Sequence, residues 1–279
     1  MRPQRRSQAV RVSTAKNAAR SGVAVVSGSP AAAGSVLLSA RLPGIPPRVV
    51  PCFGIERRCT SLIASRGGGE HLHERPDMDA LIAGYRRFRT ETWPHRRQML
   101  ERLAEHGQQP RALVIACADS RVDPAMIFDA APGEIFVVRN VANLVPPFQP
   151  DGAYHGTSAA VEFGVLGLGV SDLIVMGHGL CGGVRALIEG VPEGLETFVG
   201  PWIRLAEPAC ARVLACHPAD PQLACEHATV RLACDNLLTF PWIATRVADG
   251  RLRLHGAHFD IRTGVLAMLG PDGTFVRVT

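Results

Sequence analysis

The sequence predicts an α/β fold, a mainly parallel β-sheet flanked by helices with an antiparallel pair of strands at the C-terminal end. From residue 78 on, short runs rich in β-branched residues alternate with segments of helical periodicity, as in chains that form parallel sheets. Near the C-terminus two such runs follow each other with no helical segment between them, which indicates a hairpin. The 279 residues, 47% of them hydrophobic, suffice for one large core.

The first predicted elements are two helices and a strand. Apolar residues recur at helical spacing after Asp79, which we expect to be the N-cap of the first helix. A second helix is expected over 94–105, ended by Gly107, and a buried strand over 112–116.

The remaining elements alternate between strand and helix. In chain order they are a short helix opened by Asp123 and Pro124 and reaching 128, a strand over 135–138, a helix over 157–168, a strand over 173–176, a helix over 182–189, two long helices near 198–216 and 221–238, and a hairpin with strands 252–255 and 265–269. The helix over 157–168 is rich in Ala and Gly, so we expect another element to pack closely against it.

Residues 1–77 differ in composition from the rest and leave three interpretations open. They are rich in Arg, Ser, Ala, Gly and Pro without a sustained period, as in a disordered extension or in sequence upstream of a true start at Met78. The same Arg-rich, acid-poor composition is typical of a transit peptide. A secretory signal with its apolar region over 23–40 is the third interpretation, but Gly and Pro interrupt that stretch. We expect the folded domain to cover 78–279.

Charge and cysteine content exclude several classes of protein. Eight of the 30 basic residues and none of the 25 acidic residues lie in residues 1–55. Residues 56–279 therefore hold 22 basic and 25 acidic residues, so the folded part is slightly acidic. Nucleic-acid binding would need a basic face, and no apolar segment is long enough to span a membrane. Eight cysteines in 279 residues do not make a disulfide framework, which favours a reducing, cytoplasmic location.

Five residues form the most informative pattern in the chain. Cys117, Asp119 and Arg121 lie in ACADSR directly after one predicted strand, and His178 and Cys181 lie in GHGLCGG after another. Open α/β sheets place their sites at such strand ends. Thiols and imidazole are zinc ligands, and a carboxylate lies nearby to compete for a fourth position. Taken singly, each residue is better explained as a structural one; the joint pattern indicates a metal site.

The chain resembles the β-class carbonic anhydrases over about residues 79–270. The resemblance rests on ACADSRVDP, PGEIFVVRNVANLVPP, HGTSAAVEFGV, GHGLCGGV, NLLTFPWI and LHGAHFDI, which occur in the family's order. It implies one Zn²⁺ per subunit on Cys117, His178 and Cys181, and a catalytic dyad of Asp119 and Arg121. It also implies a homodimer or larger homo-oligomer with active sites at the subunit interface.

The resemblance extends to five substrate-pocket positions with less detail. Gln108 lies where one subclass has an amide that binds substrate, and Phe136 and Phe163 would line an apolar pocket, although the family often has Tyr at the second of these. Gly182 and Gly183 would let the backbone approach the site closely.

A regulatory feature of some family members is expected to be absent. In those members a bicarbonate bound near the position of Arg139 locks a closed state, and a Trp lies three residues before the first ligand. Here that position is Val114. We therefore expect an open site without this switch. The alternative role for Arg139 is an ion pair at a dimer interface or in the core.

The remaining cysteines are expected to be structural. Cys210, Cys216, Cys225 and Cys234 lie in the two long predicted helices at spacings that match no zinc ribbon, although His217 and His227 leave a second metal site conceivable. Cys52, Cys59, His71 and His73 lie in the irregular N-terminal region and receive no role.

The expected function is that of a zinc lyase, the reversible hydration of carbon dioxide to bicarbonate and a proton. Two thiolates and an imidazole leave zinc one position for water, and zinc lowers the pKa of such a water to about 7 at catalytic sites. Because thiolates donate more charge than imidazoles, we expect a less acidic water here unless Arg121 compensates. While Arg121 holds Asp119, the carboxylate stays off the zinc and can orient the zinc-bound hydroxide; released, it becomes a fourth ligand and closes the site. Two alternatives stay open: hydrolysis of carbon disulfide or carbonyl sulfide on the same scaffold, and a non-catalytic zinc protein.

Overall fold

The computed structural model of the protein describes residues 77–279. The interpretations of residues 1–76, including those of Cys52, Cys59, His71 and His73, lie outside this part. The limits predicted for the folded domain, 78–279, stay a prediction.

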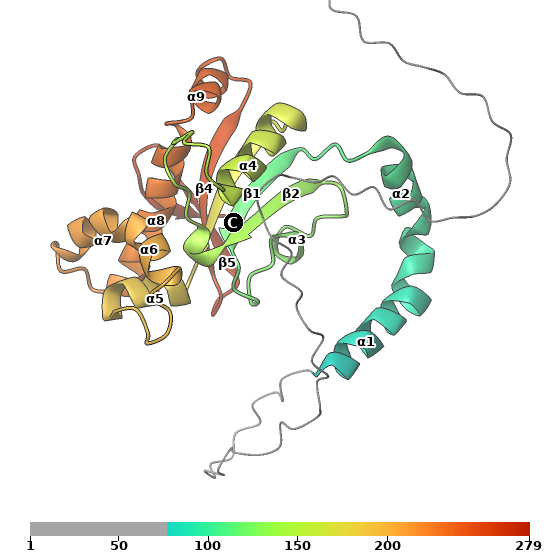
Figure 1. Cartoon of the computed structure of the whole chain (residues 1–279), viewed down its shortest axis with the longest axis horizontal. Helices are drawn as coiled ribbons and strands as arrows, with labels where there is room; N and C mark the ends of the chain where they lie inside the picture. Colours follow the sequence, from blue (N-terminus) through green and yellow to red (C-terminus); the bar gives the residue numbers. More distant parts are fainter. Residues whose placement is uncertain (1–76) are drawn as a thin grey trace, which may run out of the picture. The chain divides into compact units, whose positions relative to one another are not determined.

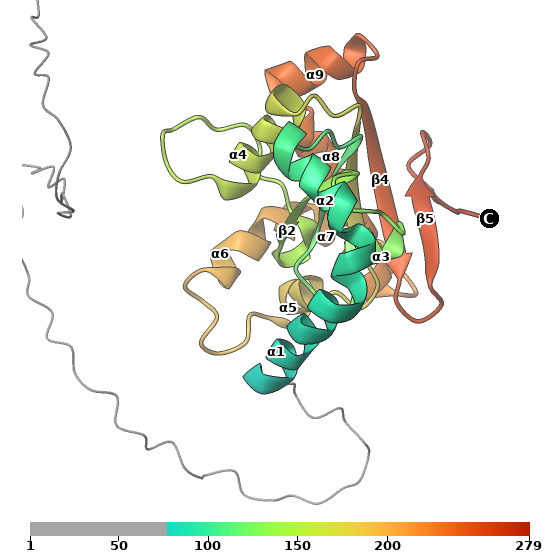
Figure 2. The same cartoon turned by 90° about the vertical axis from the view of Figure 1, so that its right-hand side faces the viewer.

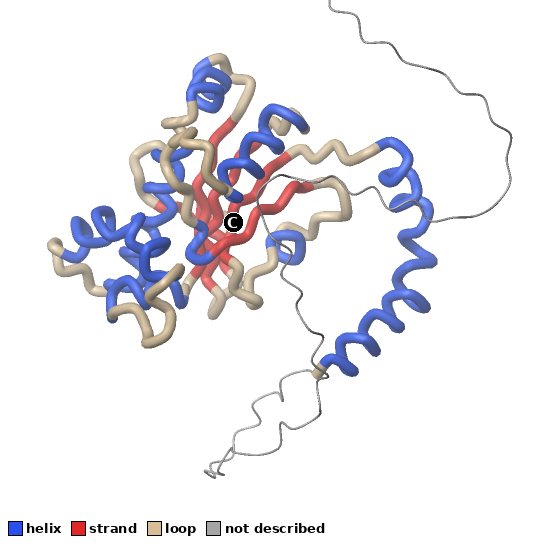
Figure 3. Tube along the Cα trace, viewed as in Figure 1, coloured by secondary structure: helices blue, strands red, loops and turns tan. Residues whose placement is uncertain are grey.

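Six strands form one mixed sheet in the order β2-β1-β3-β4-β5-β6 (Figure 1, Figure 3). The first four are parallel: β1 (Ala112–Cys117), β2 (Ile135–Asn140), β3 (Asp172–His178) and β4 (Arg253–Asp260). β5 (Val265–Leu269) and β6 (Phe275–Arg277) run antiparallel to their neighbours. The predicted fold class and the C-terminal hairpin are confirmed, while β6 was not predicted because its three residues are too short to give a pattern.

The N-terminal helices join into one another without a break. α1 (Met78–Arg87) leads through a π-helical turn (Phe88–Thr92) into α2 (Trp93–His106). The prediction of Asp79 as N-cap is wrong: the Asp77 carboxylate accepts the Ala80 N–H at 2.8 Å, two residues earlier. Gly107 ends α2 as expected, with a φ of 78°.

One face of the sheet carries the main core. Leu113 and Ile115 of β1 pack in one buried cluster with residues of α8 (Pro221–Leu237) and α9 (Pro241–Ala248) and with Val161 of α4 (Gly156–Glu162). α8 packs along β3 and β4, and Figure 2 shows it beside β4. α4 continues as a π-helical turn (Phe163–Gly167), where a Cβ at Gly164 would collide with the Leu113 side chain. The close packing expected from the Ala- and Gly-rich helix is therefore present.

The opposite face holds a smaller cluster around Val114, Ala116 and Met176, against which α3 (Pro124–Ile127) packs. Because α3 follows β1 and α4 follows β2, consecutive connections lie on opposite faces of the sheet. In the sheet, β1 lies between β2 and β3, so the strand order reverses direction at β1. Ligands of open α/β sheets bind at such a switch point, at the carboxyl ends of the strands.

The long helix predicted near 198–216 is wrong. It is broken into α6 (Val199–Ile203), a 3₁₀ turn (Arg204–Ala206) and α7 (Glu207–Leu214). Pro208 lies in the first turn of α7, where its missing N–H and fixed φ favour a helix start and not a helix interior. α5 (Gly182–Glu189) has the predicted bounds, and α9, which Pro241 opens, was not predicted. Within residues 77–279 no helix combines the length and the apolar character that a membrane span requires.

Candidate metal centre

Three side chains from separate elements meet at the carboxyl edge of the sheet. Cys117 is the last residue of β1, His178 is the last residue of the adjacent parallel strand β3, and Cys181 is the N-cap of α5. All three are buried, with exposed fractions of 6%, 1% and 1%. Strand pairing thus brings together the ligand types that the sequence separates by some sixty residues.

The ligand atoms are spaced as on a small metal ion. One atom from each residue lies within 4.8 Å of the others, and the two Sγ atoms are 3.9 Å apart. Two thiolates on a tetrahedral zinc, each about 2.3 Å from the metal, lie about 3.8 Å from one another. The separation of the thiols therefore matches tetrahedral coordination.

The His178 ring is oriented for coordination. Its Nδ1 donates to the carbonyl oxygen of Gly179 at 2.9 Å, which leaves Nε2 as the unprotonated nitrogen. This Nε2 is buried and has no hydrogen-bond partner among the described residues. A buried lone pair without a donor is costly, and a metal ion between the two thiols would satisfy it.

The two thiols are electrostatically coupled. The hydrogen bond from Cys181 lowers the pKa of Cys117 well below its ordinary value, with smaller contributions from His178 and from backbone N–H groups. The pKa of Cys181 is raised, first by its hydrogen bond to Cys117 and then by burial. One thiolate therefore forms readily, and a second next to it requires a cation.

Asp119 is held beside this cluster by Arg121. The Nε and Nη2 atoms of Arg121 donate to Oδ1 and Oδ2 of Asp119 at 2.9 and 2.6 Å, and the Arg121 N–H adds a bond of 3.0 Å. This fork lowers the pKa of Asp119 to about 2. Oδ2 is only 3.9 Å from His178 Nε2, so the carboxylate lies next to the cluster while Arg121 occupies both of its oxygens.

Arg139 stabilises the loop that carries the dyad. It donates to the carbonyl oxygens of Cys117 and Asp119 at 3.0 and 2.6 Å and pairs with Asp123 at 3.1 Å. Arg139 thus makes an ion pair within the chain, and Val114 is buried within β1. The expected absence of a bicarbonate switch stays a prediction.

The five predicted pocket residues differ in their exposure and in their contacts. The Phe136 and Phe163 rings pack together with centroids 5.8 Å apart, and Phe163 is 54% exposed. Gln108 is exposed in the segment between α2 and β1. A Cβ at Gly183 would lie 2.8 Å from Val141 Cγ1, whereas a Cβ at Gly182 would meet open space. The requirement for close approach therefore lies at Gly183.

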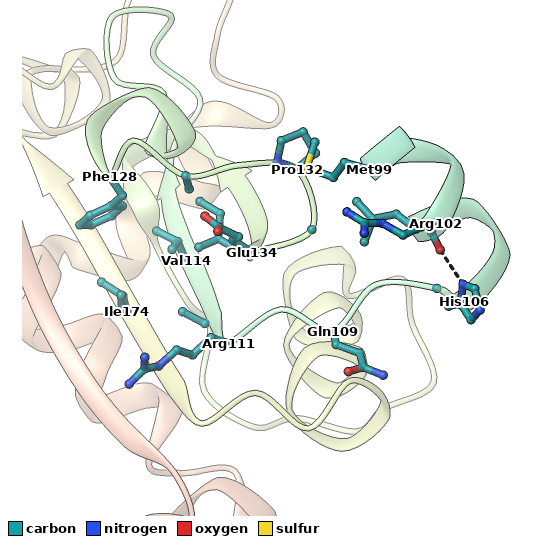
Figure 4. A pocket seen from close by; sticks show the side chains of 16 residues that line it. Met99, Arg102, His106, Gln109, Arg111, Val114, Phe128, Pro132, Glu134 and Ile174 are labelled. Atoms are coloured by element: carbon teal, nitrogen blue, oxygen red, sulfur yellow. Dashed lines mark hydrogen bonds between the residues drawn. The ribbon is translucent and has the colours of Figure 1, made fainter. Parts of the chain in front are cut away.

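A cavity of the described part of the chain lies away from this cluster. A hollow of about 850 Å³ lies between α2 and the sheet, lined by apolar residues such as Leu103, Val114 and Phe128, with Arg102 and Arg111 also on its wall (Figure 4). None of the three candidate ligands lines it. The candidate metal centre is therefore located by its ligand side chains and not by the size of a cavity.

Two residues that shape the centre were not predicted from the sequence, Leu180 and Glu226. Leu180 lies between His178 and Cys181 with a φ of 59°, a left-handed conformation that costs a non-glycine residue about 1–2 kcal/mol, and no sequence signal marks it. Glu226, on α8, reaches the backbone of Cys181. A lone carboxylate between Cys225 and His227 in a helix can indicate a buried acid, but no sequence spacing indicates its contact with Cys181.

A second metal site does not form from the remaining cysteines and histidines. Among residues 77–279, the only group of three or more potential ligands that come together is Cys117, His178 and Cys181. Cys210, Cys225 and Cys234 are buried, as expected of structural cysteines, and Cys216 is exposed.

Comparisons with known proteins agree with this architecture. The sequence model of the carbonic anhydrase family matches residues 112–266. A carbonic anhydrase of Pseudomonas aeruginosa is 38% identical over 205 residues, which are 72% of this chain and 92% of that protein. The structure of the β-carbonic anhydrase CcaA superposes with a TM-score of 0.66 at 30% identity, covering 72% of this chain and 99% of CcaA. A tetrameric β-carbonic anhydrase of the ascomycete Sordaria macrospora gives a TM-score of 0.57 at 26% identity, covering 69% and 96% of the two chains. The chain therefore belongs to the β-class carbonic anhydrases.

Proposed function

We propose that this protein is a zinc enzyme that interconverts carbon dioxide and water with bicarbonate and a proton. The observation that carries the proposal is the buried Cys117–His178–Cys181 cluster, with its unpartnered Nε2, beside a carboxylate that Arg121 holds. Membership of the carbonic anhydrases supports the reaction.

The donor set fits Zn²⁺. Two thiolates and one neutral imidazole are common zinc ligands, and their spacing agrees with tetrahedral coordination. Structural zinc sites use four protein ligands, whereas catalytic sites keep one position open. Asp119 is the nearby carboxylate, and its engagement by Arg121 favours a site with three protein ligands over the non-catalytic alternative.

When bound, zinc would supply hydroxide from water at neutral pH. Asp119, which lies beside the three ligands, would accept a hydrogen bond from the attacking group and would so orient it toward carbon dioxide. Arg121 is a positioning residue: its planar fork keeps Asp119 oriented and prevents the carboxylate from taking the open position. The buried walls of the cluster limit access of bulk water.

The substrate pocket and the assembly belong to the same proposal. Gln108, Phe136, Phe163, Gly182 and Gly183 are proposed to surround the substrate, with the Phe136–Phe163 pair as its apolar wall. A homodimer or larger assembly is supported by exposed apolar side chains on α1, including Leu81 and Tyr85 at 58% and 62% exposure. A cytoplasmic location stays a prediction from cysteine content.

A hydration assay with matched zinc analysis tests the function. The purified chain should contain about one zinc per subunit and hydrate carbon dioxide in a stopped-flow assay. Activity should be lost with a chelator and restored by zinc. A zinc-loaded protein that leaves carbon dioxide unchanged but hydrolyses carbonyl sulfide or carbon disulfide would replace the proposed substrate with the heterocumulene alternative.

A further inference from the structure

A buried carboxylate on α8 contacts the backbone of a candidate metal ligand. Glu226 is only 2% exposed, and its Oε1 accepts the N–H of Cys181 at 3.0 Å. The same oxygen accepts Gln222 Nε2 at 2.7 Å, and Oε2 is 3.0 Å from His258 Nε2. The contacts use both oxygens of the carboxylate. Burying a charged group costs free energy unless hydrogen-bond donors surround it. We therefore expect the buried Glu226 carboxylate to have a specific role.

The backbone N–H of Cys181 requires a hydrogen-bond acceptor from outside α5. Cys181 is the N-cap of α5 and is itself 1% exposed, so its N–H is a buried donor that the helix does not satisfy. Glu226 provides the acceptor. Gln222, one turn earlier on α8, donates to the carbonyl oxygen of Cys181 at 3.0 Å. α8 therefore holds both ends of this residue's backbone.

The loop before Cys181 is one that needs such support. Leu180 adopts a φ of 59°, which disfavours a side chain with a Cβ, and Arg121 Nη2 donates to its carbonyl oxygen at 3.2 Å. The Arg121 contact and the Glu226 contact hold the two sides of one peptide, because the Leu180 carbonyl and the Cys181 N–H belong to the same peptide bond. Without them, a rotation of the Cys181 peptide would relieve the strain and redirect the thiol.

His258 supports the carboxylate from the far side. The His258 and His227 rings pack edge to face with their centroids 4.8 Å apart, and the His227 ring stacks on the Phe275 ring with centroids 3.9 Å apart. A cleft of about 290 Å³ borders these groups, and its lining includes Glu226, His227 and His258. The support for Cys181 thus extends from α8 to β4 and β6.

We propose that Glu226, held by Gln222 and His258, is a positioning residue for the metal centre. It fixes the Cys181 peptide so that Sγ stays directed at the ion, and it does so through the backbone of the ligand instead of its side chain. The inference rests on the proposed zinc role of Cys181. Partners in the shell around metal ligands typically contribute ten- to hundredfold in metal affinity.

A chelator-competition measurement on the full chain tests this role. Glu226→Ala should weaken zinc binding by about ten- to hundredfold. Glu226→Gln should keep most of the affinity, because its amide oxygen can still accept the Cys181 N–H. Leu237→Ala is the matched control: it removes a buried side chain from the same helix, away from the loop, and should lower the thermal stability of the zinc-free protein without weakening zinc binding.

Equal zinc affinity of wild type and Glu226→Ala would overturn the inference while leaving the proposed function intact. Equal weakening by Leu237→Ala would also overturn it, because the effect would then be one of general stability. If Glu226→Ala does not fold, Gln222→Ala answers the same question: weaker zinc binding supports the positioning role, and unchanged binding refutes it. A wild-type chain that binds no zinc would refute the proposed function itself.

Discussion

Replacing Arg121 with alanine removes the fork that holds Asp119. Two side-chain hydrogen bonds, of 2.9 and 2.6 Å, are lost together with the 3.2 Å bond to Leu180, while the backbone bond from residue 121 to Oδ1 can persist. The freed carboxylate has Oδ2 only 3.9 Å from His178 Nε2. We expect it to turn onto the metal and block the position that the nucleophile needs.

The expected effect is large on rate and small on stability. The Arg121 side chain is 48% exposed, so solvent screens the ion pair and its loss should cost about 1 kcal/mol of folding free energy. Correct placement of a proton-accepting group contributes about 10²–10⁴ in rate, and a hundredfold loss corresponds to about 2.7 kcal/mol in the barrier. A rate loss of that size therefore cannot be explained by unfolding.

Charge loss is not the cause of this effect. Arg121 lowers the pKa of Asp119 to about 2, against about 3.9 for an ordinary aspartate, so the carboxylate remains ionised at neutral pH in the variant. Because the folded-state pKa is the lower one, the pair stabilises the fold above about pH 4. The stability difference between wild type and Arg121→Ala should shrink as the pH falls from about 4 to about 2.

The assay is stopped-flow hydration of carbon dioxide at neutral pH, with zinc content measured on each sample. Arg121→Lys should recover only part of the rate, because an ammonium cannot hold both oxygens at once. Arg97→Ala removes an exposed arginine that pairs with Glu101 far along the chain on α2, and it should leave the rate unchanged. A zinc-replete Arg121→Ala enzyme with a rate within about twofold of wild type would refute the positioning role, since the proposed contribution is at least about a hundredfold.

Three further predictions concern the ligands, the glycines and the domain limits. Cys117→Ser should lose or weaken zinc binding, and full zinc retention by metal analysis would contradict its assignment as a ligand. Gly183→Ala should reduce zinc content and thermal stability because its Cβ would lie 2.8 Å from Val141, whereas Gly182→Ala meets open space and serves as the control; equal behaviour of the two would show that close approach is not required. A chain starting at Met78 should fold and hydrate carbon dioxide, and loss of folding, seen by circular dichroism, would mean that residues before it belong to the domain.

Local patterns in the sequence predict most of the sheet. Continuous apolar runs around Leu113 and Leu173 mark strands buried on both faces, and the Asp123-Pro124 pair marks the start of α3. The predicted helix near 198–216 was wrong because its apolar composition outweighed the breaking effect of Pro208. Short elements such as β6 depend on pairing with distant residues, which local patterns do not show.

The metal ligands could be predicted from the sequence, whereas the residues that hold the ligand loop in place could not. Cys117 and His178 could be expected to meet because both end strands, and strand pairing does bring them together. The left-handed Leu180 and the reach of Glu226 to Cys181 depend on tertiary packing between elements 45 residues apart, so no spacing rule reveals them. The pocket expected around Gln108 stays a prediction.

The most direct test is a crystal structure of the zinc-loaded protein at the pH of full activity, with zinc located by anomalous scattering. We predict zinc on Cys117, His178 and Cys181, with Asp119 still held by Arg121 and no fourth protein ligand. Zinc bound elsewhere, or Asp119 completing the coordination shell in the active enzyme, would contradict this prediction.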